Sequence, residues 1–191
     1  MTVEQGLKQT DRAYDQLVEV NQMMTDAIFN AFLFTWQWWL GIGLFIFPWF
    51  IWILFRDKKN TGRLLLAGFI TIILSLLIDL IAMSYGLWSY PMKFLPISPV
   101  LFLPYHLSLA PVAVMFVLQV GPRVSLFIKG IIFAGIAAFG GMNLFDAIGF
   151  YNPRGWPTIY DFFIFLFIYI IASLFYKIDN YDEKVSHTRK P

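Results

Sequence analysis

The chain has 191 residues, of which 59% are apolar and 14% charged, with a formal net charge of +2 and no cysteine. Soluble domains contain roughly 45–50% apolar and about 25% charged residues, so the composition predicts an all-α polytopic membrane bundle. The lack of cysteine excludes disulfides, thiolate metal sites, cysteine nucleophiles and S-palmitoylation. Five spans of about 20 residues each use most of the length, which excludes a separate soluble catalytic domain.

Residues 1–27 are predicted to form an extracytoplasmic amphipathic helix. Its apolar stripe follows alternating steps of four and three residues; the stripe consists of Val3, Leu7, Thr10, Tyr14, Leu17, Asn21, Met24 and Ile28. One interpretation is a helix that docks a membrane-protein partner or a second copy of the chain. We favour an amphipathic extension of the first span that rests on the bundle or the membrane interface, because Thr10 and Asn21 weaken the stripe.

Five transmembrane helices are predicted to form a bundle within residues 28–177. The apolar runs cover residues 36–55, 64–90, 99–120, 126–150 and 158–176. The prolines of the third run predict a bent or broken helix; they are Pro104 and Pro111. The fourth run carries small residues at four-residue spacing, which favours close helix packing; they are Gly130, Ala134 and Ala138, with Ala137 and Gly141 beside them.

The placement of basic residues predicts the orientation in the membrane. Most of the 14 Lys and Arg residues lie in connectors on one side of the predicted bundle. Positively charged loops stay on the cytoplasmic side. The prediction is therefore a multi-pass protein of the cell membrane with its amino terminus outside and a cytoplasmic tail at residues 178–191. A cleavable signal peptide is not predicted, since no basic segment precedes a short apolar region.

Three aspartates are the exceptions to a chain whose other formal charges lie in termini and connectors. Asp79, Asp146 and Asp161 fall inside apolar runs, and a charge at bilayer depth usually faces a bundle interior or a wet cavity. The helical rise puts Asp79 and His106 roughly 12–14 Å below the outer surface, on antiparallel neighbours. Asp146 and Asp161 lie roughly 7–8 Å deep. We expect a polar cleft open to the outside.

Asp79 and His106 are the candidate catalytic residues, because a carboxyl group beside an imidazole in a low dielectric can share a proton. The predicted ligand-binding residues are Asp79, Trp88, Tyr105, His106, Asn143, Asp146 and Asp161. The structural alternative is a helix-to-helix hydrogen bond at Asp79, and a solvated or capping role is favoured for Asp146 and Asp161. No metal site, cofactor or nucleic-acid partner is predicted, because the motifs for them are absent.

Several segments carry a family resemblance, of which Gly-Leu-Trp-Ser-Tyr-Pro at residues 86–91 is the most distinctive. The others are residues 62–68, Pro104, Pro111, and residues 149–152 before Trp156. Over roughly residues 40–176 the chain resembles an uncharacterised five-span integral membrane protein family known mainly from endospore-forming Firmicutes. The resemblance implies a membrane protein without an assigned activity. The chain departs from the pattern at His106, where an acidic residue is more usual, and at Met142, where a glutamate is.

A weaker similarity connects Asp79, Gly86 and Trp88 with membrane lycopene cyclases, in which an aspartate precedes a glycine and a tryptophan near a helix end. The paired glutamates of those enzymes are missing here. This similarity implies only that an acidic cleft can protonate an apolar, isoprenoid-like substrate.

Three functions follow as hypotheses. The favoured one is a non-enzymatic membrane component that binds a small ligand or a partner, in a spore-related process if the family resemblance holds. The second is a membrane-embedded acid/base enzyme acting on a lipid or isoprenoid, with Asp79 as proton donor and His106 as its partner. The third is proton- or cation-linked transport, which the lack of acidic or polar groups in the inner half of the bundle disfavours.

Overall fold

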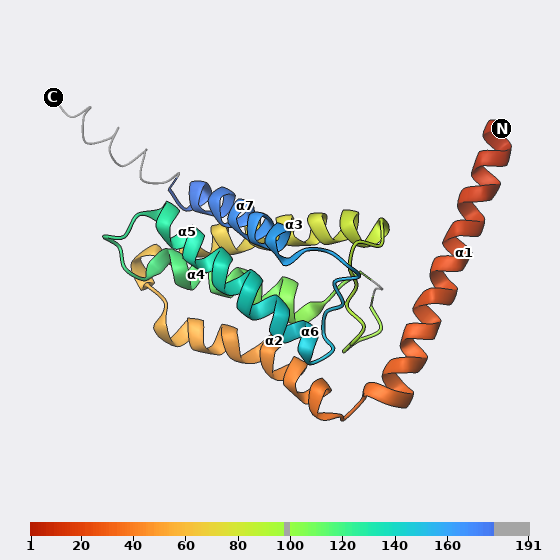
Figure 1. The fold of residues 1–191 in the computed structure, drawn as a ribbon, viewed down its shortest axis with the longest axis horizontal. Helices are drawn as coiled ribbons and strands as arrows, with labels where there is room; N and C mark the ends of the chain where they lie inside the picture. The colour runs from red at the N-terminus through yellow and green to blue at the C-terminus, as the bar shows by residue number, and fades with distance from the viewer. Residues whose placement is uncertain (98–99, 178–191) are drawn as a thin grey trace.

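A computed structural model describes residues 1–97 and 100–177 of the chain. The helices are α1 (Val3–Ala27), α2 (Trp36–Phe55), α3 (Thr61–Ser84), α4 (Ala110–Gln119), α5 (Leu126–Gly135), α6 (Asn143–Ala147) and α7 (Thr158–Lys177). Turns of π-helix extend three of them, namely η1 (Ile28–Phe32), η3 (Tyr105–Leu109) and η4 (Ile136–Met142), and a 3-10 turn, η2 (Lys58–Asn60), precedes α3. In Figure 1, α2 to α7 form a bundle from which α1 projects. The predicted cytoplasmic tail, residues 178–191, lies outside the described residues.

Within the described part of the chain, four helices are long and apolar enough to cross a membrane. They are Trp36–Phe55, Lys58–Ser84, Leu126–Ala147 and Thr158–Lys177. The third predicted span contributes the apolar but shorter helix Tyr105–Gln119, so the five-span count is not confirmed. The span predicted for residues 99–120 was too long, because residues 101 and 102 are not helical. Four apolar helices are compatible with a multi-pass membrane protein.

The second predicted span ends six residues earlier than the sequence suggested. Gly86 has a φ of 69°, which costs glycine little, and the amides of Gly86 and Leu87 bond to the carbonyls of Met83 and Ala82 at 3.0 Å each. This hydrogen-bond pattern is a Schellman motif. It stops α3 at Ser84 and turns the following connector back over the end of the bundle.

The third helix is irregular at its prolines, as predicted. Proline lacks an amide hydrogen, so Pro111 leaves the carbonyl four residues earlier, at Leu107, without its helical partner. The indole Nε1 of Trp49 donates to the Leu107 oxygen at 2.7 Å. This bond gives the Leu107 carbonyl a donor in place of the missing proline amide, and it links α2 to η3, the π-helical turn that carries His106.

Small residues bring α5 and η4 close to α7, which confirms the packing predicted from their spacing. Gly130, Ala134 and Ala138 are all buried. A Cβ atom added at Gly130 would lie 2.7 Å from the Tyr169 ring of α7, so only glycine fits there. Ala137 and Gly141, on the neighbouring face, instead line a groove described below.

The α1 helix forms as predicted, but it does not rest on the bundle. Thr2 and Gln5 make a capping box at its start. No residue of α1 is buried, and Leu7, Tyr14 and Leu17 of the apolar stripe are each more than half exposed. The stripe from Val3 to Leu17 is therefore exposed, whereas its last residue, Ile28, is buried, and docking through the exposed part stays a prediction.

The basic connectors gather at one end of the bundle, which we call the basic end. It comprises the 56–60 connector, the 120–125 connector and the last turn of α7, which Figure 1 places together. The opposite end, the aromatic end, consists of residues 85–97, 100–104 and 148–157. There the amide of each of Ser89 and Asn152 bonds to the carbonyl of the other. The assignment of the basic end to the cytoplasm remains the sequence-based prediction.

Candidate functional site

Asp79 lies at the centre of a buried polar cluster beneath the aromatic end. Its Oδ2 atom accepts from the Tyr90 hydroxyl at 2.7 Å and lies 2.7 Å from His106 Nε2, and its Oδ1 accepts from Trp88 Nε1 at 3.2 Å. The exposed fraction is 4% for Asp79 and 0% for His106. The predicted meeting of Asp79 with His106 is thus confirmed, and three hydrogen-bonding side chains converge on one carboxyl group.

The backbone at Phe102 orients the His106 ring. Nδ1 is 3.2 Å from the Phe102 amide nitrogen and 2.9 Å from the Phe102 oxygen. If Nδ1 accepts from the amide, the other nitrogen carries the hydrogen and donates to Asp79. A neutral imidazole and an ionised carboxylate then satisfy every bond in the cluster. In the other tautomer Nδ1 carries the hydrogen and donates to the Phe102 oxygen, and Nε2 accepts from a protonated Asp79 carboxyl group. The Asp79–His106 pair can therefore hold its shared proton on either residue.

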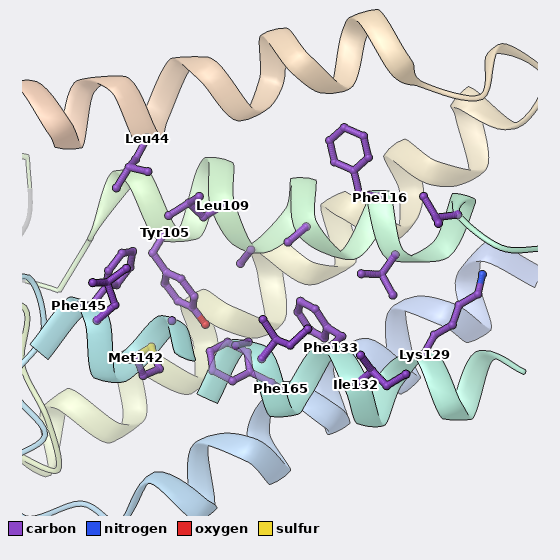
Figure 2. Close-up of a pocket in the computed structure, with 18 of the residues that line it drawn as sticks. Leu44, Tyr105, Leu109, Phe116, Lys129, Ile132, Phe133, Met142, Phe145 and Phe165 are labelled. Carbon is purple, nitrogen blue, oxygen red and sulfur yellow. The ribbon is translucent and has the colours of Figure 1, made fainter. Parts of the chain in front are cut away.

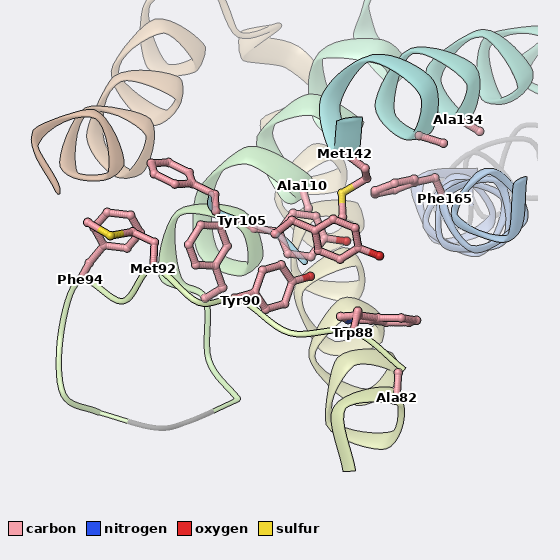
Figure 3. Packing of buried hydrophobic residues seen from close by; sticks show 14 residues of the cluster. Ala82, Trp88, Tyr90, Met92, Phe94, Tyr105, Ala110, Ala134, Met142 and Phe165 are labelled. Atoms are coloured by element: carbon pink, nitrogen blue, oxygen red, sulfur yellow. The ribbon is translucent and has the colours of Figure 1, made fainter. Parts of the chain in front are cut away.

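The connector that follows α3 supplies much of the cluster. In Figure 3 the chain carrying Trp88, Tyr90, Met92 and Phe94 folds across the bundle end. The Tyr90 ring stacks on Phe102 with centroids 4.8 Å apart. The sequence predicts that Trp88 and Tyr90 end the second apolar run and that a short outer loop with Lys93 follows. Trp88 and Tyr90 are buried instead, because α3 ends at Ser84 and the turn at Gly86 leads the chain back over the core.

Asp161 joins the edge of this cluster through two tryptophans. Trp156 Nε1 donates to Asp161 Oδ1 at 3.1 Å, and the Trp156 ring packs edge-to-face on Trp88 at 5.0 Å. Asp161 is buried, with 6% exposed. Asp161 is therefore part of the same buried end of the bundle.

Two predicted ligand-binding residues lie apart from the cluster. Asn143 and Asp146 are exposed on α6, and the Asn143 side-chain amide donates to the Phe139 carbonyl of its own helix turn at 2.8 Å. Four others of that set, Asp79, Trp88, His106 and Asp161, are nearly buried. The expected open polar cleft is thus a packed cluster, because the connector covers it.

Lys93 is a buried cation that the sequence placed in a solvated loop. Its exposed fraction is 4%, and its Nζ donates to the Leu101 carbonyl at 3.5 Å. Burial lowers the pKa of Lys93 to about 8, and the negative charge of Asp79 partly opposes this shift. Lys93 therefore adds a second ionisable group near Asp79.

Hydroxyl groups continue inward from Asp79, which corrects the expectation of an inner half without polar groups. Thr71 and Ser75 are buried on the same face of α3. Each donates within its own helix, to the carbonyls of Ala67 and Ile72. Such internal bonds satisfy the hydroxyls locally, and so they give no support to a hydrated path.

An apolar groove runs along α4 between α2 and α5. Its volume is about 840 Å³, within the roughly 300–1,000 Å³ of small-molecule sites. Figure 2 shows lining residues from both helices, with Leu109 and Phe116 on the side of α4 and Ile132 and Phe133 on α5. Small side chains leave the space open; they are Ala110 and Ala113 on α4 and Ala137 and Gly141 on η4.

Tyr105 connects the groove with the polar cluster. It lines one end of the groove together with Met142 and Phe145, and its ring lies 4.9 Å from the His106 ring. The groove does not reach Asp79 or His106 themselves, as neither lines it. Tyr105 is thus the predicted site residue that faces both features.

Sequence analysis missed three participants and the groove. From the sequence, Tyr90 is predicted to lie at the membrane interface, Trp156 in a structured outer loop and Lys93 in a short loop. Indole and phenol donors within a dozen residues of a span aspartate were the available signal for the two aromatics. The groove left no local signal, since its lining comes from several helices that are distant in sequence.

Comparison with protein-family models, with curated proteins and with solved structures finds no match to this chain.

Proposed function

We propose that this protein is a multi-pass membrane component that binds the hydrocarbon chain of a membrane lipid in the α4–α5 groove. The observation that carries the proposal is the groove itself, an apolar hollow of about 840 Å³ on the bundle. Its lining residues include no carboxylate, and a hydrocarbon chain is the ligand that such a lining favours.

The dimensions of the groove suit a lipid chain. Helix Tyr105–Gln119 lies along the groove, and its 15 residues correspond to roughly 22 Å of helix. One leaflet supplies roughly 15 Å of hydrocarbon, half of a core about 30 Å thick. A chain of one leaflet lying along α4 therefore covers about two thirds of this helix.

Photo-crosslinking tests the proposal directly. The protein is reconstituted in nanodiscs containing a phospholipid with a diazirine near the end of one acyl chain, irradiated and mapped by peptide mass spectrometry. We expect crosslinks concentrated on groove residues such as Ala113 and Ala137. Ala113→Phe should fill the groove and reduce these crosslinks about tenfold, because excluding two methylene groups costs about 0.8 kcal/mol each.

Ala147→Phe is the matched control, since Ala147 is exposed on α6 and does not line the groove. It should leave the crosslink pattern unchanged. Crosslinks spread evenly over all lipid-facing helices, with no response to Ala113→Phe, would contradict lipid binding in the groove.

A second candidate function is acid/base chemistry on the bound chain. It is favoured by one observation, that Tyr105 lines the groove and packs on His106, which is 2.7 Å from Asp79. A proton shared by Asp79 and His106 would lie behind Tyr105, which separates the pair from the groove. In this function the two residues act as a proton donor and its partner.

The lipids that co-purify with the protein distinguish a binder from an enzyme. Asp79→Asn keeps the size of the side chain and removes its acid. An enzyme should yield a co-purified lipid of different mass from wild type and from Asp79→Asn, whereas a binder should yield the same lipid from both. The same lipid from both proteins, at equal amount, would exclude Asp79 from catalysis.

A further inference from the structure

Lys129 is a buried cation that lines the groove at the end opposite Tyr105 and Met142, as Figure 2 shows. The sequence placed it in a connector, but it lies in the first turns of α5 with only 8% of its surface exposed, and it lines the groove. Its Nζ donates to the Leu118 carbonyl near the end of α4 at 3.2 Å. An ammonium group has three donors, so this bond leaves two for another acceptor.

No acidic side chain lines the groove around Lys129, and the described acid of the basic end is Asp57, whose amide bonds to the Gln119 side chain at the end of α4. The amino-terminal end of α5 follows Ser125, whose side chain makes no capping bond, so the first amides of that helix keep their partial positive charge. A cation four residues into a helix is disfavoured by the same dipole. Arg123, in the adjoining connector, adds a further positive charge, and no Asp or Glu lines the groove.

These features complement a negative charge. We propose that the groove binds a lipid with an anionic head group of the phosphate class, its oxygens at Lys129 and the α5 amino terminus and its chain extending toward Tyr105. The inference rests on the proposed chain-binding function and specifies its ligand. The occupant is a lipid of the bilayer, since the apolar lining requires the chain and the basic end requires the charge.

Native mass spectrometry of the full-length protein in neutral detergent tests the head group. The probes are hexadecyl phosphate and hexadecanol, which share a chain and differ in charge. We expect wild type to retain the phosphate about tenfold more strongly than the alcohol, as charge-assisted hydrogen bonds imply. Lys129→Gln should bring the two probes to nearly equal retention, and Lys129→Arg should preserve the preference.

Lys177→Gln is the control, because Lys177 is an exposed cation at the same end of the bundle that does not line the groove. It should keep the wild-type preference. Equal retention of both probes by wild type would overturn the head-group assignment while leaving chain binding intact. Retention of neither probe, in wild type and Ala113→Phe alike, would instead overturn the proposed function. The wild-type comparison decides the outcome even if Lys129→Gln fails to fold.

Discussion

The polar cluster and the groove are neighbours that use opposite chemistry. The cluster encloses an aspartate whose two oxygens contact three side chains, whereas the groove is an open apolar hollow. Buried polar groups are costly unless each is paired, so the cluster holds the aromatic end together. Open apolar surface has little energetic role within the chain itself. We therefore expect the cluster to contribute stability, while the proposed ligand contact belongs to the groove.

Removing Asp79 should produce the largest loss of stability. Asp79→Ala leaves His106, Tyr90 and Trp88 without their shared acceptor, and breaking a buried pair costs about 3–5 kcal/mol. The free energy of unfolding, measured by SDS titration from mixed micelles, should fall by this amount. Asp146→Ala is the control on exposed α6 and should change it by less than about 0.5 kcal/mol. An equal loss of unfolding free energy for Asp79→Ala and Asp146→Ala would contradict the stabilising role of the cluster.

Tyr90→Phe should have an intermediate effect. The substitution deletes one donor to the Asp79 carboxyl group and keeps the ring stacked on Phe102. A hydrogen bond to a charged group contributes about 1.5–3 kcal/mol, and the same SDS titration should register it. Tyr85→Phe, at a position 79% exposed, should be silent, and a Tyr90→Phe protein as stable as wild type would remove Tyr90 from the cluster's energetics.

Lys93 should give stability a dependence on alkaline pH. The pKa of Lys93 in the folded chain, about 8, is below the usual lysine value of 10.5, so the unfolded state binds more protons between these values. Stability from this group therefore rises with pH from about 8 to 10.5 and is constant at its lowest below that window. Lys93→Met should raise the thermal midpoint at pH 7 and flatten the rise relative to wild type. Parallel pH profiles for both proteins would contradict this.

Removal of residues 1–27 should have the smallest effect on stability. Because α1 buries no residue, we expect the free energy of unfolding of the remaining bundle to change by less than about 0.5 kcal/mol. Light scattering on the full chain and on the truncated chain tests self-association through the apolar stripe. If copies associate through α1, the particle mass should be lower after truncation. An unchanged mass would leave α1 without a role in joining copies.

Sequence reasoning succeeded where a signal is local. Apolar runs, the prolines of the third helix and the spacing of Gly130, Ala134 and Ala138 each predicted a helix or its packing, because hydrophobicity, ring geometry and side-chain size act on neighbouring residues. The pairing of Asp79 with His106 also followed from helix rise. The sequence by itself thus determined an apolar all-helical chain with an acid held inside it.

Only the tertiary structure decided which polar residues are enclosed and where space is left. Gly86 turns the chain so that Trp88 and Tyr90 return to Asp79, and nothing in their own positions distinguishes this from an interfacial role. Asp146 and Asp161 have the same side chain and the same predicted depth, yet Asp146 is exposed and Asp161 is buried, since helix rotation sets which way a residue faces. The groove exists because α2 and α5 lie on either side of α4, and that arrangement depends on packing across the whole bundle.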